Sequence, residues 1–421
     1  MSFSFIHTAD LHLDAPLRAL ALRDAGLAEQ VGTASRQTLS RIIDLCIDEQ
    51  VAFLLIAGDL WDGTASTRTP RFLHQELQRL TDAGIRCYII RGNHDPVTRS
   101  LGELDPPPGV VRFGARPGTE RLDLDGHVVA IHGLSFREAQ APESLLPRYP
   151  APVPGAFNIG MMHTSLDGSP GHDRYAPCSL HELQATGYDY WALGHIHKRS
   201  EHPGRTTVVM PGIPQGRDIN EGGDRSVTLV RVADDGQVAL EQHVVAGLRF
   251  ERCPIDCTGL TSRDDLIDRI SATLRDLAAR PRLESHLVIR ILLQGTTPLA
   301  WQVARDLDLL TPQLREMTRD HGLWLDRLVN ELDGRAVEAA ARGRLPQDLV
   351  EGVLHDMIDD PGVLAQVEAE VQVIIKALPA ELRDMLGEEG AAFGAACRDL
   401  LREGTPLVLA SLDGEGGPDA A

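Results

Sequence analysis

Histidines, aspartates and one asparagine that could hold metal ions recur in short groups along the first half of the chain. Each group directly follows an apolar run that is typical of a β-strand. Because α/β sheets place their ligands beyond the carboxyl ends of the strands, we expect these side chains to meet at one edge. The candidate metal ligands are Asp10, His12, Asp59, Asn93, His163, His195 and His197.

The spacing within these groups suits a shared ion. In the pairs Asp10/His12 and His195/His197, an extended backbone points both side chains the same way, so both can contact one metal. A glycine precedes three members of the set and lets the backbone approach a metal closely. Carboxylate, amide and imidazole donors together suit Mn, Fe or Zn better than Mg or Ca. Seven donors exceed the roughly four to six that one ion accepts, which predicts two divalent ions.

Two such metals, about 4 Å apart, can clamp a phosphoryl group, activate a bound water and offset charge on the leaving oxygen. The predicted reaction is therefore hydrolysis of a phosphoester. The metals alone do not distinguish DNA from a cyclic nucleotide or a nucleotide pyrophosphate, because the non-bridging oxygens are alike. One D-x-H triplet would be a weak signal, but five such elements, each after a predicted strand, form a strong one.

The elements that must position these residues alternate between strands and helices up to about Val245, which is typical of an α/β domain. The stretch from Arg36 to Glu49 carries the apolar stripe of a helix packed on a sheet. The predicted strands are Phe3–His7, Phe53–Ala57, Cys87–Arg91, Val128–His132, Phe157–Met162 and Tyr190–Leu193.

The pattern changes after Gly247, where no further motif occurs. We expect a catalytic domain in residues 1–245, an accessory domain in 246–345, and an acidic helical region in 346–421 with a disordered tail from Asp413. The accessory elements, alternately strand and helix, are Phe250–Ile255, Arg263–Ala279, Leu287–Leu293, Leu299–Met317 and Leu323–Val329.

The motifs D-x-H, G-D-x-x-D, G-N-H-D, a lone H and G-H-x-H occur in this order, and the sequence thereby resembles the calcineurin-like metallophosphoesterase family. The resemblance implies an α/β fold in which a β-sandwich is flanked by helices, followed by a small α+β capping domain. It also implies that Asp59 bridges two metals. One metal would be held by Asp10, His12 and His197, and the other by Asn93, His163 and His195.

The same resemblance assigns roles to three residues that do not bind metal. His94 would contact the scissile phosphate or protonate the leaving oxygen, and Asp95 beside it is the second candidate catalytic residue. Asp95 and Asp62 would orient the histidine and the loop.

The stretches Phe5–Asp14, Tyr175–Leu180, Tyr188–His197 and Pro211–Arg217 are similar to the DNA repair exonuclease branch of this family, of the YhaO type related to SbcD. This implies Mn-dependent cleavage of DNA ends, a coiled-coil ABC-type ATPase as partner, and a homodimer within a larger complex. Two alternatives stay open. One is a small-molecule phosphodiesterase or nucleotide pyrophosphatase that uses the same metals, and the other is a DNA-end-binding scaffold with a vestigial site.

Charge and cysteine content constrain how the protein binds DNA and in which compartment it is expected. The formal net charge is −20, of which −12 falls after residue 345 (4 basic and 16 acidic residues) and −8 before it. A DNA enzyme normally has a basic surface, so we expect the ATPase partner to supply most of the DNA-binding charge. The six scattered cysteines are expected to be buried and reduced. No secretory signal or membrane span is visible, which predicts a cytoplasmic protein.

Overall fold

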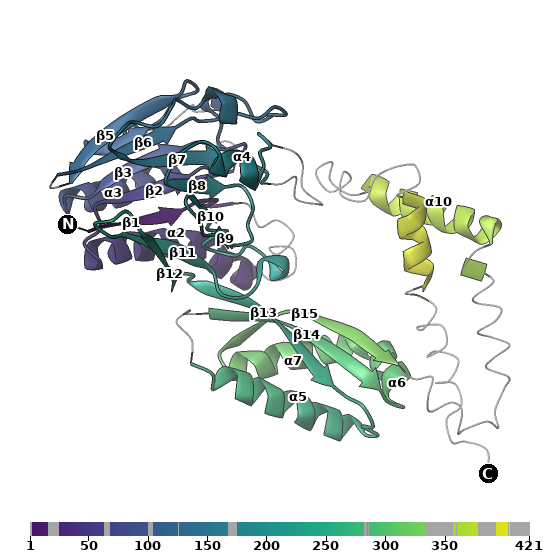
Figure 1. The fold of residues 1–421 in the computed structure, drawn as a ribbon. Coiled ribbons are helices and arrows are strands. Elements are labelled where there is room, and N and C mark those ends of the chain that lie inside the picture. The colour runs from purple at the N-terminus through teal and green to yellow at the C-terminus, as the bar shows by residue number, and fades with distance from the viewer. Residues whose placement is uncertain are drawn as a thin grey trace, which may run out of the picture. The chain divides into compact units, whose positions relative to one another are not determined.

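Figure 1 shows the computed structural model of the chain, which divides into two compact units. The first unit comprises residues 1–251 and 281–289, and the second comprises 252–280 and 290–421. The structure describes residues 2–15, 25–62, 68–99, 104–124, 126–166, 175–281, 284, 286–333, 357–358, 360–377, 393–402 and 404. The tail predicted from Asp413 to be disordered lies outside the described residues.

Two six-stranded sheets form the centre of the first unit. The first has the order β12-β11-β1-β2-β3-β4, in which β1 to β4 are parallel and β11 pairs antiparallel with both β1 and β12. Its strands are β1 (Phe3–Thr8), β2 (Phe53–Ala57), β3 (Arg86–Ile90), β4 (Val110–Arg112), β11 (Ser226–Val232) and β12 (Val238–Val244). The second has the order β5-β6-β7-β8-β10-β9, in which β6, β7, β8 and β10 are parallel. Its strands are β5 (Gly118–Leu124), β6 (His127–Gly133), β7 (Phe157–His163), β8 (Tyr190–Gly194), β9 (Ser200–His202) and β10 (Thr207–Met210).

The two-residue period of the strands sorts apolar side chains into separate layers. Phe5 packs with Phe53, Tyr88 and Ile159 in a cluster that joins the two sheets face to face. Ile6, the next residue of β1, belongs instead to a cluster on the other face of the first sheet. This alternation confirms the predicted α/β sandwich.

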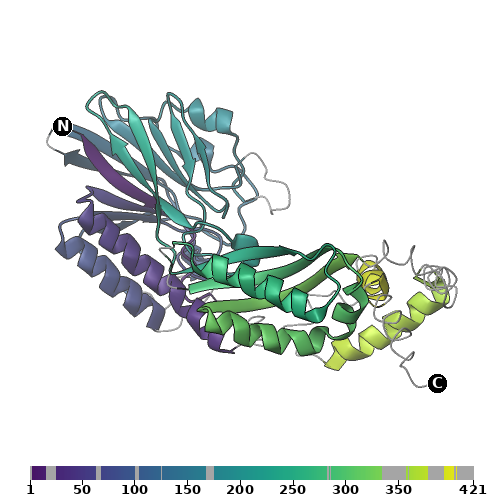
Figure 2. The same ribbon diagram turned by 90° about the horizontal axis from the view of Figure 1, so that it is seen from below.

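Helices cover the outer faces of this sandwich. The purple helices α2 (Ala25–Asp48) and α3 (Arg68–Asp82) lie side by side against the first sheet in Figure 2. The short helix α4 (Leu180–Gln184) and the 3-10 turns η1 (Val97–Arg99), η2 (Leu146–Arg148) and η3 (Ile219–Glu221) complete the unit. α2 begins before the predicted start at Arg36, because Leu27 and Val31 extend its buried stripe at a spacing of four residues.

A buried histidine ties the two sheets together close to the ends of β1 and β8. His7 Nδ1 lies 3.0 Å from the Tyr190 hydroxyl, and its Nε2 lies 3.0 Å from the Leu193 carbonyl oxygen. Burial lowers the pKa of His7 to about 3, so the ring is neutral. A carbonyl only accepts, so Nε2 donates to Leu193 and Nδ1 accepts from Tyr190.

The accessory elements follow the predicted strand–helix order with one difference. A three-stranded sheet in the order β13-β14-β15 accompanies α5, α6 and α7. The predicted single helix Leu299–Met317 is wrong: it is two helices that meet at Asp306, where φ −95° and ψ 12° leave the helical region. The Asp306 carboxylate is bound there by Arg305 Nε at 2.8 Å, and aspartate is a weak helix former. The bounds are β13 (Leu248–Asp256), α5 (Arg263–Ala278), β14 (His286–Thr296), α6 (Ala300–Arg305), α7 (Leu307–Asp320) and β15 (Leu323–Asp333).

Beyond residue 346 the described residues are largely helical. They include α10 (Pro361–Ala377) and residues 393–402, which share a small apolar cluster of Ile375, Phe393 and Cys397. Among the helices that the structure describes, none has the length and apolar character needed to cross a bilayer. All six cysteines are buried and free of disulfides, as expected.

Candidate metal centre

Six of the seven candidate ligands come from loops that follow β1, β2, β3 and β8, and the seventh, His163, is the last residue of β7. Donor atoms here form three groups, and within each group the atoms lie within 4.8 Å of one another. The structure therefore brings together residues that are far apart in the sequence, from both sheets of the sandwich. The groups are Asp10, His12 and His197; Asp59, His163 and His195; and His12, Asp62 and His94.

The loops after β1 and β2 continue side by side past the end of the sheet. The Asp10 N–H donates to the Gly58 carbonyl and the His12 N–H to the Asp59 carbonyl, both at 3.0 Å. Three of these residues have left-handed backbones, with φ of 54° at Asp10, 41° at His12 and 54° at Asp59. His195 also has a positive φ, at 103°. Such conformations cost energy in non-glycine residues and concentrate at functional sites.

Glycines give the loops the close approach that the sequence predicts. A Cβ atom added at Gly92 would lie 2.2 Å from Asp59 Oδ1 and 2.6 Å from His163 Nε2. At Gly194 it would lie 2.1 Å from the Ala57 carbonyl oxygen. A side chain at Gly92 would occupy the space between two donor atoms, and one at Gly194 would collide with the backbone at the end of β2.

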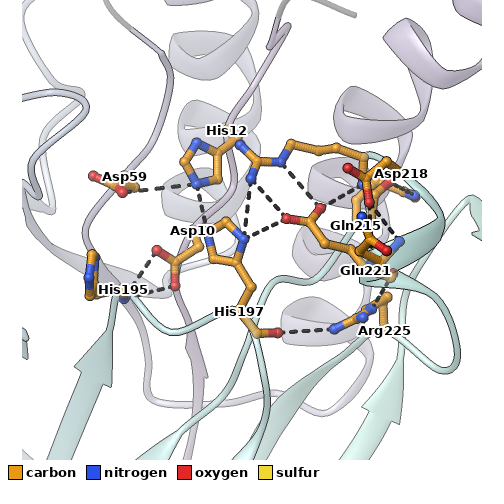
Figure 3. Close-up of polar contacts among 12 residues, drawn as sticks. Asp10, His12, Asp59, His195, His197, Gln215, Asp218, Glu221 and Arg225 are labelled. Carbon is orange, nitrogen blue, oxygen red and sulfur yellow. Dashed lines mark hydrogen bonds and ion pairs between the residues drawn. The ribbon is translucent and has the colours of Figure 1, made fainter. Parts of the chain in front are cut away.

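The orientation of two imidazoles fits a metal ion. His12 Nδ1 lies 2.6 Å from Asp62 Oδ1, and His197 Nδ1 lies 2.6 Å from Glu221 Oε1. A carboxylate only accepts, so each Nδ1 carries the proton and each Nε2 presents a lone pair. The two Nε2 atoms lie 3.2 Å apart (Figure 3). Neutral rings would repel at that distance, whereas a cation bound by both would be stabilised.

The second donor group also favours a positive charge. His163 Nε2 lies 3.0 Å from Asn93 Oδ1 and 3.3 Å from Asp59 Oδ2. Burial lowers the pKa of His163, but the charges of Asp59 and Asp10 outweigh burial and raise it to about 9. Since these carboxylates attract a proton to a fully buried ring, a divalent ion fits the same surroundings.

Asp59 lies between the two groups. Its Oδ2 is 3.3 Å from His163 Nε2 and 3.9 Å from His12 Nε2, while its Oδ1 accepts from the His94 N–H at 3.0 Å. Although burial works against the charged form, His163 and His12 hold the pKa of Asp59 well below its usual range. The residue therefore presents a carboxylate to both groups.

His94 stands at the open side of the site, with 43% of its side chain exposed. Its Nδ1 lies 2.9 Å from Asp62 Oδ1, and this hydrogen bond raises the pKa of His94. Asp95 is placed differently: it is 1% exposed, and its carboxylate accepts from the Leu60 and Gly92 N–H groups at 3.0 and 2.8 Å. Burial and the charge of Asp59 raise the pKa of Asp95. These contacts orient the loops after β2 and β3.

Glu221 is a functional candidate that the sequence did not indicate. Burial works against its charged form, but hydrogen bonds from His197 and Arg217 hold its pKa below the usual range. It belongs to η3 and follows no apolar strand, so the pattern that located the other residues is missing. The nearest signal was Arg217, at the end of the stretch Pro211–Arg217.

Comparisons with known proteins identify the family. The profile of the calcineurin-like phosphoesterases matches residues 3–199, and that of the middle domain of metallophosphoesterase YhaO matches residues 250–333. The uncharacterized metallophosphoesterase YhaO of Bacillus subtilis is 33% identical over 345 residues, which cover 79% of this chain and 83% of that protein. The chain belongs to the calcineurin-like metallophosphoesterases. As a metallophosphoesterase it is a metal-binding hydrolase.

Two further relatives of this metallophosphoesterase have nuclease or repair names. The DNA double-strand break repair protein Mre11 of Methanopyrus kandleri is 26% identical over 229 residues, which cover 50% of this chain and 48% of that protein. One subunit of the nuclease SbcCD of Rhodobacter capsulatus is 32% identical over 136 residues, 30% of each chain. The chain thus spans about half or less of these two relatives.

Proposed function

We propose that this metallophosphoesterase is a nuclease that hydrolyses phosphodiester bonds of DNA with two Mn ions. The observation that carries the metal assignment is the place of Asp59 between two donor groups, 3.3 Å from His163 Nε2 and 3.9 Å from His12 Nε2. Mixed imidazole, amide and carboxylate donors favour Mn over Mg. The proposed ligands are Asp10, His12 and His197 for one ion, Asn93, His163 and His195 for the other, and Asp59 for both.

Residues that do not bind metal would position the substrate and transfer a proton. Two divalent ions, when bound, would neutralise phosphate charge and make a water molecule more acidic. Asp62 accepts a hydrogen bond from His94 Nδ1 and so leaves Nε2 of that ring to face the substrate. A protonated His94 can donate from Nε2 to a phosphate oxygen or to the leaving oxygen. Asp95 holds the two loops that carry Asp59 and His94.

DNA as substrate is supported by the names of the Mre11 and SbcCD relatives and not by the donor atoms. We extend the proposal to a coiled-coil ABC-type ATPase partner, a homodimer and a cytoplasmic setting, for which six free cysteines are suitable. We also propose that the boundary between the catalytic and accessory regions lies near residue 245, and that between the accessory and acidic regions near residue 345.

The purified chain is expected to cleave DNA when Mn is added. The test incubates the protein with Mn, Mg or Zn and end-labelled single- and double-stranded DNA, with bis(p-nitrophenyl) phosphate as a generic phosphodiester. We expect Mn to give the highest rate on both substrates. Hydrolysis of the generic ester without any cleavage of DNA would overturn the proposal in favour of a small-molecule phosphodiesterase, and turnover of cyclic nucleotides or dinucleotides would reinforce that conclusion.

The affinity of the isolated chain for DNA is expected to change only gently with salt. Each phosphate neutralised by the protein contributes about −0.9 to the slope of log K against log salt. The chain has 41 basic residues against 61 acidic ones, so few of its cations are expected to be available to phosphate, and we expect a slope of roughly −3 or shallower. Fluorescence anisotropy across a salt series measures it. A slope steeper than about −5 would show that the chain itself carries an extensive basic surface.

A further inference from the structure

Behind His197 lies an ion pair that the proposed reaction leaves without a role. Glu221 Oε1 accepts from His197 Nδ1 at 2.6 Å and from Arg217 Nη2 at 2.8 Å. The other carboxylate oxygen, Oε2, accepts from the backbone N–H of Arg217 at 2.8 Å and from its Nε at 3.2 Å. The guanidinium therefore binds the carboxylate through two nitrogens, and such bidentate pairs are both stronger and more specific in geometry than single hydrogen bonds. Figure 3 shows the Glu221 side chain directed at the His197 ring.

The same guanidinium reaches a second carboxylate. Arg217 Nη1 lies 3.8 Å from Asp62 Oδ2, and Asp62 Oδ1 lies 2.6 Å from His12 Nδ1. Each of the two histidines is thus held from behind by a carboxylate, and one arginine lies between the two carboxylates. We call this set of Asp62, Arg217 and Glu221 the carboxylate bracket.

Local structure fixes the bracket in place. Asp218 caps η3 by accepting from the Glu221 N–H at 3.3 Å, and Arg225 donates to the carbonyl oxygens of His197 and Glu221 at 3.0 and 2.7 Å (Figure 3). A Cβ atom at Gly216 would lie 2.3 Å from the Glu221 carbonyl oxygen, so only glycine allows this approach. The backbone around Glu221 is therefore linked to the backbone of His197 through the Arg225 guanidinium.

The contacts of the bracket lead to the first of the two donor groups and, through Asp62, to His94. Glu221 and Arg217 reach His197 and, through Asp62, His12. Within the part of the chain that the structure describes, neither side chain forms a hydrogen bond or ion pair with His163 or Asn93. A carboxylate behind a metal-binding imidazole fixes its tautomer and orientation and makes the ring a better donor.

We propose that Glu221 and Arg217 are positioning residues for the metal ion held by Asp10, His12 and His197, and that they set the affinity of that ion alone. The inference rests on the two-metal centre of the proposed function. Glu221 keeps the proton of His197 on Nδ1, and Arg217 holds Glu221 and Asp62 in the geometry that points both Nε2 atoms at one ion. Neither residue needs to touch the substrate.

The test is a calorimetric titration of the full chain with Mn after the metals have been removed with a chelator. The wild-type chain is expected to bind two Mn ions. In Glu221→Ala, one of the two affinities should fall by about 10- to 100-fold, the loss typical of removing such a partner, while the other stays within about twofold. A folding defect would weaken both sites, so the selective loss separates positioning from general stability.

Variants at Arg217 test the second half of the bracket. Arg217→Met removes the charge and should weaken the same Mn site, whereas Arg217→Lys should restore part of the affinity, because an ammonium reaches one carboxylate at a time. The control is Glu241→Ala, which removes a carboxylate that Arg231 binds at 2.8 Å in an exposed ion pair. This control is expected to leave both Mn affinities unchanged.

Three results would overturn the inference. They are unchanged Mn binding in Glu221→Ala, equal weakening of both sites, and an Arg217→Met variant whose KM rises while its Mn affinities stay at the wild-type values. The last result would make Arg217 a substrate contact. The titration contains no DNA, so its outcome does not depend on nuclease activity. A chain that binds two Mn ions but does not cleave DNA would contradict the proposed nuclease function without contradicting the inference about Glu221 and Arg217.

Discussion

Replacing His94 with asparagine is expected to reduce the rate of DNA cleavage by about 10²- to 10⁴-fold, the usual worth of a positioned acid or base. The two donor groups around Asp59 should still bind two Mn ions, because the proposed ligands remain. The His94 side chain is 43% exposed and bonded to Asp62 at 2.9 Å, so an asparagine fits the space without disturbing buried packing. Rates at saturating Mn and the Mn content of the purified variant measure the two effects.

The choice of substrate tells which role His94 has. An alkoxide leaving from DNA needs a proton, whereas p-nitrophenolate leaves readily without one. If His94 protonates the leaving oxygen, the loss on DNA should exceed the loss on bis(p-nitrophenyl) phosphate. If it instead stabilises the phosphate oxygens, both losses should be similar. His181→Asn, which changes an exposed histidine of α4, is the matched control. Wild-type rates on both substrates in His94→Asn would remove the residue from the mechanism.

The candidate site was predictable because its residues follow strands whose pattern is unambiguous. All five residues of β2, Phe53–Ala57, are buried, so its end is clear in the sequence and Asp59 comes two residues later. The left-handed backbone at Asp59 was not predictable, since the only local sign is the preceding glycine. Motif spacing therefore located the donor atoms, while the strained loops that bring them together became visible only in the fold.

Glu221 shows where this kind of prediction ends. It lies 24 residues after His197, its hydrogen-bond partner, and belongs to a one-turn helix with no periodic pattern. Its position depends on contacts from Arg217 and Arg225, each four residues away, and no local rule connects such contacts to a distant histidine. Local propensity also explains why the predicted start of α2 at Arg36 is too late. Gly32 is a poor helix former and interrupts the apolar helical pattern, although Leu27 and Val31 before it are buried.

Gly92→Ala is expected to abolish binding of at least one Mn ion and to lower hydrolysis by more than about 10²-fold, because a misplacement of about 1 Å already costs that much. The added Cβ atom would lie 2.2 Å from Asp59 Oδ1 and 2.6 Å from His163 Nε2, distances that real Cβ atoms essentially never show. Relief requires movement of the Asp59 carboxylate, of the buried His163 ring or of the loop, and Asp95 holds that loop through the Gly92 N–H at 2.8 Å. Each movement separates atoms that must face one ion.

The backbone of Gly92 is not left-handed, so an alanine there meets no conformational penalty, and the effect isolates the space between the donors. Gly114→Ala is the matched control, since a Cβ atom there has nothing within 4 Å and the residue is exposed. Metal analysis, Mn titration and rates on bis(p-nitrophenyl) phosphate should separate the two variants, with Gly114→Ala indistinguishable from wild type. If Gly92→Ala bound two Mn ions and kept its rate, Asp59 and His163 could not both be ligands in the proposed arrangement.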